Sequence, residues 1–187
     1  PADAPASASC PPRPAPDPGR ALRQQAVLAA FSRFALRNRQ IPAILQEAAR
    51  LAAEGSGAPL SRILRYEART GTLMLIEGTG WRIEGGGGIH VPLDARFPAG
   101  QAFIAGRPVI HPRPHGEGRA ALPSFLLEHG VRRGLDVVIP GRISPFGVLG
   151  VDDTAGGQFT AGDIAFLEAL GSGLGLAIEA AREASGR

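Results

Sequence analysis

The sequence contains one cysteine and no lysine among its 187 residues. A single cysteine excludes a disulfide-stapled scaffold and an all-cysteine metal site. No apolar run approaches the roughly 20 residues that a membrane-crossing helix needs. The N-terminal segment also lacks the apolar stretch of a secretory signal. We therefore expect a cytoplasmic protein that has no contact with a membrane.

The chain also carries little net positive charge. All 20 basic residues are arginines, and the formal net charge at pH 7 is only +3. The densest basic stretch, Arg33, Arg37 and Arg39, falls at the end of an expected helix, where cations interact favourably with the helix dipole. Surfaces that bind single-stranded nucleic acid often carry exposed aromatic residues between their positive charges. No such aromatic residues are expected between these arginines. The composition therefore predicts no nucleic-acid partner.

Residues 1–20 are rich in proline and alanine and hold almost no large hydrophobic side chain. Such a segment cannot bury enough apolar surface to offset the entropy lost on ordering, so it predicts a disordered tail. The tail contains Cys10 and begins with Pro1 rather than methionine, which suggests a piece of a longer protein. Residues 21–187 are expected to form one domain, because this length and a hydrophobic content of 44% allow a single core.

Hydrophobic periodicity divides residues 21–187 into helices and strands. Helical spacing covers 21–37 and 41–54, and Gly55 is expected to cap the second helix. Strands are predicted at 60–66, 72–77, 89–93, 108–111, 135–139 and 146–151, with short helices near 99–105 and 123–129. Thr160 and Asp163 form a capping box that begins a final long helix. Strands joined by tight turns predict an α+β fold with a largely antiparallel sheet.

Three glycines interrupt the final helix, at Gly171, Gly173 and Gly175. Each costs about 1 kcal/mol relative to alanine inside a helix. We therefore expect this helix to approach the backbone of the sheet or of another helix closely at these positions.

Several segments, in their order and spacing, resemble a GAF domain, most closely the N-terminal GAF domains of bacterial sensor histidine kinases of the HWE type. The segments are Ile41–Ala58 (IPAILQEAARLAAEGSGA), Gly78–Trp81 (GTGW), Pro98–Val109 (PAGQAFIAGRPV), Leu127–Arg133 (LEHGVRR), Phe146–Val151 (FGVLGV) and Phe159–Leu167 (FTAGDIAFL). The resemblance covers most of residues 21–184. It implies an antiparallel sheet of about six strands with the N- and C-terminal helices on one face. Two short helices and their loops would close a small-molecule pocket on the other face.

Domains of this family are sensory, so the resemblance implies a small-molecule-sensing or regulatory module of a bacterial signal-transduction protein. We expect the input module of a two-component histidine kinase, a homodimer whose terminal helices pass a shift to a C-terminal output domain. No phosphoacceptor or ATP-binding segment is present, so we expect that this chain is not an enzyme. Two alternatives stay open: a ligand-free dimerisation scaffold, and a sensor that binds haem or another chromophore.

The specialised chemistries of GAF domains find little support here, and no particular cofactor is predicted. Covalent bilin attachment needs a cysteine at the pocket or upstream of it. Cys10 lies upstream in the tail, but no PAS domain separates it from this domain as in bacteriophytochromes. Reduction of free methionine sulfoxide needs several cysteines inside the domain, and residues 21–187 contain none. A cyclic-nucleotide motif is matched only at Phe159 and Asp163, which helix capping explains. Haem would need an axial ligand. Among His90, His111, His115 and His129, the best candidate is His111, which is expected at the pocket mouth.

Asp136 is the most informative site candidate, because aspartate is depleted in strands and an unpaired buried charge is costly. It either contacts a donor group of a ligand or forms a salt bridge with Arg132 or Arg133. Trp81 either lines the pocket or covers an edge of the sheet. The remaining ligand-binding candidates are chosen by position: Gln101, Ser124 and Phe125 on the short helices, with His111 and Arg133. No catalytic or metal-binding constellation is recognisable.

Overall fold

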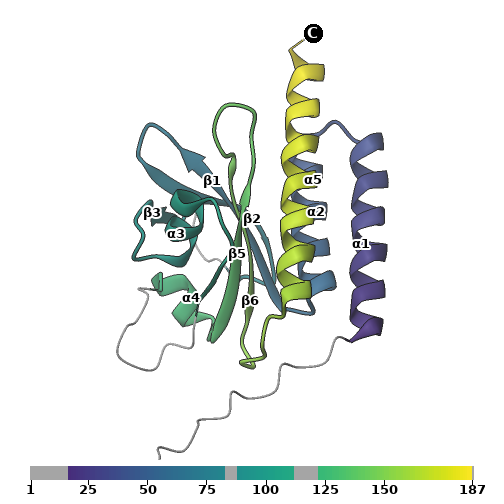
Figure 1. The fold of residues 1–187 in the computed structure, drawn as a ribbon. Helices are drawn as coiled ribbons and strands as arrows, with labels where there is room; N and C mark the ends of the chain where they lie inside the picture. Colours follow the sequence, from purple (N-terminus) through teal and green to yellow (C-terminus); the bar gives the residue numbers. More distant parts are fainter. Residues whose placement is uncertain (1–16, 83–87, 112–121, 187) are drawn as a thin grey trace, which may run out of the picture.

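Six strands form one sheet with helices on both of its faces in the computed structural model, which describes residues 17–82, 88–111 and 122–186 (Figure 1). The elements in chain order are α1 (Pro18–Arg37), α2 (Ile41–Ser56), β1 (Leu60–Glu67), β2 (Thr72–Thr79), β3 (His90–Pro92), α3 (Pro98–Ala105), β4 (Val109–His111), α4 (Ser124–Glu128), β5 (Arg133–Ile139), β6 (Gly147–Asp153) and α5 (Ala161–Ser185). The strand order is β3-β2-β1-β6-β5-β4, and all neighbouring strands are antiparallel. The predicted α+β class with a six-stranded antiparallel sheet is confirmed.

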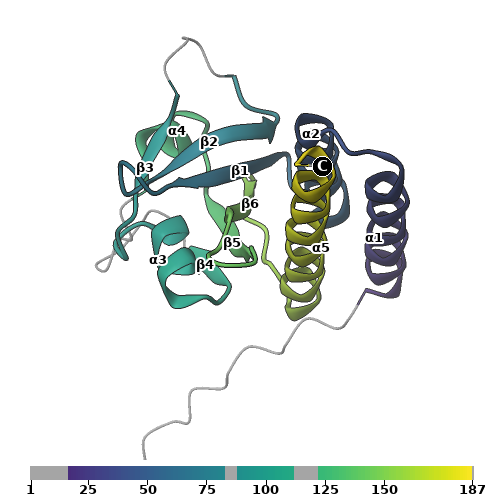
Figure 2. The ribbon, with the colours of Figure 1, turned by 90° about the horizontal axis from the view of Figure 1, so that it is seen from above.

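The three long helices lie on one side of the sheet. α2 and α5 pack directly on it, and α1 packs outside them against both helices (Figure 2). Leu135, Val137 and Leu149 of the sheet belong to one apolar core with Phe166 and Leu170 of α5. Full burial of each such side chain contributes roughly 1.5–3 kcal/mol. This core holds the N- and C-terminal helices on the same face, as predicted.

The short helices α3 and α4 cover the opposite face (Figure 2). Leu64 of β1 and Val148 of β6 point to this side and form a second core with Phe125 and Leu126 of α4. Because successive residues of a strand face opposite sides of the sheet, the sheet itself separates the two cores. The arrangement therefore has the two faces that the sequence predicted, with α3 and α4 on the face expected to carry a pocket.

The first helix begins earlier than predicted, inside the segment expected to be a disordered tail. Asp17 caps α1 by accepting a hydrogen bond from the backbone nitrogen of Gly19 at 3.0 Å. Proline at position 18 suits a first helical turn, because its missing N–H has no helical partner there in any case. The rest of the predicted tail, residues 1–16 with Cys10, lies outside the described residues.

The second helix ends later than predicted. Its C-cap is Gly57, which adopts the left-handed conformation with φ of 68°. Gly55, the predicted cap, lies inside the helix and faces α5. A Cβ on Gly55 would come within 2.2 Å of the ring of Phe166, so its small size serves helix packing rather than termination.

The final helix begins as predicted, because Thr160 and Asp163 exchange both hydrogen bonds of a capping box. Buried Asp163 also accepts hydrogen bonds from Arg20 and Gln24 of α1, each at 2.7 Å, which fastens α1 to the start of α5. Among the described helices, α5 alone has the length and hydropathy of a membrane span. Half of its most apolar stretch is buried inside the fold, as in the core helix of a globular domain.

The glycines of α5 lie in two kinds of surroundings. A Cβ on Gly175 would lie 2.3 Å from the carbonyl oxygen of Pro140, and one on Gly171 would lie 3.2 Å from that of Val138. Close approach to β5 and the turn after it is therefore confirmed at these two positions. At Gly173 the nearest atom would be a side-chain carbon at 3.5 Å, which is an ordinary contact.

Candidate functional site

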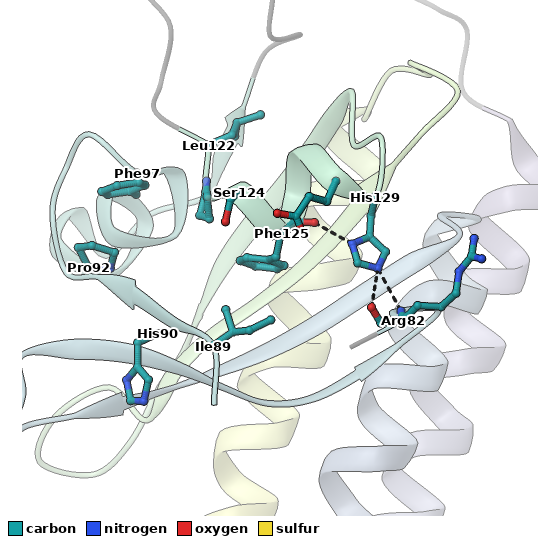
Figure 3. Close-up of a pocket in the computed structure, with 11 residues that line it drawn as sticks. Arg82, Ile89, His90, Pro92, Phe97, Leu122, Ser124, Phe125 and His129 are labelled. Atoms are coloured by element: carbon teal, nitrogen blue, oxygen red, sulfur yellow. Dashed lines mark hydrogen bonds between the residues drawn. The ribbon is translucent and has the colours of Figure 1, made fainter. Parts of the chain in front are cut away.

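A pocket of about 500 Å³ opens on the sheet face that α3 and α4 cover (Figure 3). Its walls come from β3 and its flanking residues, from the start of α3 and from α4. They combine apolar side chains with polar groups: Ile89, Pro92, Phe97, Leu122, Pro123 and Phe125, with Arg82, His90, Ser124, Glu128 and His129. Small-molecule sites are commonly clefts of about 300–1,000 Å³ with a few polar groups among apolar walls.

His129 holds one wall of this pocket in place. Its Nδ1 lies 2.8 Å from the carbonyl oxygen of Phe125, and its Nε2 lies 3.1 Å from the backbone nitrogen of Arg82 (Figure 3). Nδ1 can therefore donate to the carbonyl while Nε2 accepts from the amide. Trp81 packs edge-on against the rings of Phe125 and His129. These contacts tie α4 to the segment that follows β2.

A buried ion pair lies on the same face of the sheet. Arg62 of β1 reaches across β6 to Asp136 of β5, where Nη2 donates to Oδ1 at 2.7 Å. Nη1 of Arg62 contacts the carboxylate of Asp152. The sheet register places Gly150 between Arg62 and Asp136. A Cβ on Gly150 would lie 2.5 Å from Oδ1 of Asp136 and 2.8 Å from the guanidinium carbon, so only glycine leaves the pair its room.

His111 of β4 repeats this arrangement in the next row of the sheet. The register aligns His111, Gly134 and Asp152 across β4, β5 and β6. The imidazole lies over Gly134, where a Cβ would overlap it. Its Nε2 lies 3.3 Å from Oδ1 of Asp152 and 3.9 Å from Oδ2 of Asp136. Gly150 and Gly134 thus leave a trough on this face of the sheet. Arg62 fills it from β1, and His111 fills it from β4.

Burial decides the charges of this cluster, whose four side chains are each at most 1% exposed. Burial and the positive charges of Arg62 and Arg133 lower the pKa of His111 to about 3, so His111 is neutral near pH 7. Burial raises the pKa of Asp136, although Arg62 opposes the rise. Two carboxylates therefore face one guanidinium, and the cluster needs a further positive charge or a proton for balance.

A layer of side chains separates the cluster from the pocket. Phe97, Pro123 and Phe125 line the pocket, and they also line a void of about 10 Å³ that touches Arg62. Such a void is at the lower limit of the space that one water molecule needs. The buried cluster therefore lies one side-chain layer behind the pocket.

Two of the predicted site residues, Ser124 and Phe125, line the pocket. Trp81 lies beside it and folds over β2, the outermost described strand at that point, with Nε1 donating to the carbonyl oxygen of Ser61 at 2.5 Å. This placement matches the interpretation that Trp81 covers a sheet edge. Gln101 of α3 and Arg133 of β5 are half-buried and do not line this pocket.

Asp136 forms a salt bridge, but with a partner that the sequence did not suggest. We expected Arg132 or Arg133, whereas the structure pairs Asp136 with Arg62 of another strand. Arg133 and Asp136 are three residues apart in β5, so their side chains face opposite sides of the sheet. Two charges that are close in sequence are therefore kept apart by the strand geometry.

The histidines also differ from expectation. His111 was expected at the pocket mouth, but it is buried against Asp152. His90 is exposed and forms part of the pocket rim together with His129. His115 lies outside the described residues.

Sequence analysis missed Arg62, Asp152 and the two glycines beneath them. A signal was present, because Arg62 lies two residues from both Leu60 and Leu64 and shares their inward face. Like Asp136, Arg62 is a charged residue in the middle of a predicted strand. Gly134 and Gly150 could not be assigned a role, because a glycine trough exists only once the register of four strands is known.

Comparisons with known proteins place this fold. A family model described as GAF domain matches residues 38–179. Free methionine-R-sulfoxide reductase from Neisseria meningitidis, in complex with its substrate, has a TM-score of 0.75 at 22% identity, with 92% of this chain and 96% of that chain covered. The GAF domain of a phosphoenolpyruvate-protein phosphotransferase from Coxiella burnetii has a TM-score of 0.76 at 15% identity, with 89% and 99% covered. A phycocyanobilin-bound GAF domain from a cyanobacterial phytochrome has a TM-score of 0.69 at 15% identity, with 88% and 98% covered. No curated protein sequence matches the chain.

These likenesses correct one expectation from the sequence. The prediction that this chain is not an enzyme does not hold, because a known enzyme shares its fold over 92% of the chain. Identities of 15–22% establish the fold alone. The lack of kinase segments therefore does not decide whether this domain catalyses a reaction.

Proposed function

Because this chain belongs to the GAF domain family, we propose that it is a cytoplasmic small-molecule-sensing or regulatory domain of a bacterial signal-transduction protein. The pocket of about 500 Å³ between β3, α3 and α4 carries this proposal. Its size and its mixture of apolar and polar walls suit a compact metabolite. Two proteins of the same fold are known with a substrate or a phycocyanobilin chromophore bound.

The pocket walls indicate how such a ligand is held. Phe97 and Phe125 offer apolar contact on one side, and Ser124 and Arg82 offer hydrogen-bond donors at the rim. His129 already bonds backbone groups on two segments, so it positions the wall rather than the ligand. A ligand with an apolar body and an acceptor group complements this arrangement.

The sheet provides a route from the pocket to the long helices. Phe125 and Leu126 of α4 pack with Leu64 and Val148 on one face of β1 and β6. The other face of these strands packs against α2 and α5. A shift of α4 on ligand binding would therefore move strands on which the terminal helices rest, which is a common form of switching transition.

We extend the proposal to a homodimer in which α5 contacts its counterpart and transmits the change to an output domain such as a histidine kinase transmitter. An apolar groove of about 440 Å³ runs along α5 and includes Pro140, Gly175 and Leu176. Leu176 is 74% exposed, and exposed apolar patches favour association.

Sedimentation of purified Leu176→Glu tests this interface. A charge in the middle of the groove is expected to convert the dimer into a monomer. Leu127→Glu on α4, which replaces a leucine that is 50% exposed, is the matched control and is expected to leave the dimer intact. A wild-type monomer, or a Leu176→Glu dimer, contradicts the proposed interface.

Native mass spectrometry of the purified wild type tests the sensing proposal itself. We expect a retained small molecule, and its mass identifies the ligand. Ser124→Trp places an indole at the pocket rim and is expected to abolish retention, whereas Ser124→Ala keeps the pocket open and is the matched control. Free methionine-R-sulfoxide and phycocyanobilin serve as added probes. A protein that retains nothing and binds neither probe would instead support the ligand-free scaffold.

A further inference from the structure

The guanidinium of Arg62 is held by two carboxylates, as a bound guanidinium group would be. Its guanidinium is buried to 1% exposure and lies between carboxylates from two different strands. Nη2 is bonded to Asp136 at 2.7 Å, while Nη1 contacts Asp152. Each of two nitrogens on the planar group thus has its own carboxylate. Planar groups with two outward N–H donors match such a site better than the compact ammonium of an amine.

The charges of the site also favour a cation over an anion. Two carboxylates face a single guanidinium, and His111 adds no charge near pH 7 because burial lowers its pKa to about 3. Oδ2 of Asp136 and both carboxylate oxygens of Asp152 accept no hydrogen bond from the part of the chain that the structure describes, and the two ring nitrogens of His111 beside them also lack a partner there. Buried acceptors in excess attract a cationic donor and repel an anion.

The site lies where a ligand could reach it. Arg62 touches a void of about 10 Å³ that shares Phe97, Pro123 and Phe125 with the large pocket. A rotation of these two phenylalanine rings would join the pocket to the void beside the Arg62 guanidinium, which contacts both carboxylates. Gly150 keeps the trough open to a planar group, because no side chain projects from β6 there.

We propose that Asp136 and Asp152 form a binding site for a guanidinium or amidinium group, and that Arg62 is its internal occupant in the state seen here. This inference rests on the proposed function, since the site lies behind the proposed ligand pocket. A ligand that extends past Phe97 and Phe125 must bring such a cation to replace Arg62. A ligand without one leaves Arg62 in place and stays in the outer pocket.

Chemical rescue tests the proposal. Arg62→Ala removes the occupant and leaves both carboxylates and the trough. Methylguanidinium chloride, at millimolar concentrations far below denaturing ones, is expected to raise the melting temperature of Arg62→Ala in a saturable manner. Methylammonium chloride at the same ionic strength is expected to have a much smaller effect. The wild type, whose tethered Arg62 fills the site, is expected not to respond.

A double variant provides the control for site occupancy. Arg62→Ala combined with Asp136→Asn lacks one of the two carboxylates and is expected to lose the saturable response. The proposal is overturned when methylguanidinium stabilises Arg62→Ala no more than methylammonium does. It is also overturned when the double variant responds as strongly as the single one.

The test stays decisive when Arg62→Ala is unfolded by itself. Trp81, the only tryptophan, donates to the carbonyl oxygen of Ser61 beside Arg62, so its fluorescence reports refolding at this point of the sheet. Recovery of the native spectrum by methylguanidinium but not by methylammonium supports the proposal, and no recovery contradicts it. Mass spectrometry of the wild type tests the outer pocket separately. Either of the two proposals can therefore fail while the other stands.

Discussion

Replacing Asp136 by alanine should destabilise the fold strongly. The substitution removes one of the two carboxylates that hold Arg62, and the guanidinium it leaves behind is only 1% exposed. Breaking a buried pair by removing one partner costs about 3–5 kcal/mol. Because Asp152 remains as a second partner, we expect a loss near the lower end, about 3 kcal/mol. For a domain of this size that loss lowers the melting temperature by roughly 6–12 °C.

The chain offers a matched control in Arg50 and Glu54, whose charged atoms also lie 2.7 Å apart. These side chains are 52% and 49% exposed, so solvent screens the pair. Glu54→Ala should therefore cost only about 0.3–0.5 kcal/mol. Urea and thermal unfolding followed by circular dichroism measure both variants. A loss for Asp136→Ala as small as that for Glu54→Ala would refute the reasoning. Lost ligand retention without lost stability would favour a ligand contact instead.

Three further predictions follow from single contacts. The pKa of His111 is about 6.5 in the unfolded chain and about 3 in the folded protein. Between these pH values the unfolded state binds a proton that the folded state does not, so the free energy of unfolding decreases as the pH falls from 6.5 to 3. His111→Phe should flatten this limb of the pH profile by up to about 1.4 kcal/mol per pH unit, measured by urea unfolding at several pH values; parallel profiles would contradict it. Gly173→Ala should stabilise the protein by about 0.5–1 kcal/mol, because the added Cβ meets only an ordinary contact at 3.5 Å. Gly175→Ala should destabilise it by about 1–3 kcal/mol, because the Cβ would lie 2.3 Å from the carbonyl oxygen of Pro140. Equal melting temperatures for these two variants would show that α5 can move away from the sheet.

Much of the fold could be predicted from local patterns. The capping box of Thr160 and Asp163 depends on four consecutive positions, so it was visible in the sequence and is present in the structure. The strands and the short helices also follow from periodicity and turn residues. The boundary at Gly57 could not be read in this way. Gly55 and Gly57 are both plausible caps, and only the ring of Phe166 shows that Gly55 serves packing.

The candidate site could be predicted less well, because its residues meet across strands. A buried aspartate in a strand must have a partner, so Asp136 was recognisable. Its partner Arg62 lies on β1, two strands away in the sheet, and no local pattern connects them. The resemblance to GAF domains implied a pocket on the face where the structure has one, and Ser124 and Phe125 lie in its wall. His111 was misplaced, because its burial depends on the empty space above Gly134.

The sequence by itself therefore determined the elements of this protein and their α+β class, because periodicity, caps and turns act over a few residues. The face that carries the pocket was implied by the resemblance to GAF domains. Only the tertiary structure decided which charges meet. The antiparallel register aligns Arg62, Gly150 and Asp136 in one row and His111, Gly134 and Asp152 in the next. A buried charge is stable only where such a row supplies a partner and the room for it. Both depend on strands that are distant in the chain.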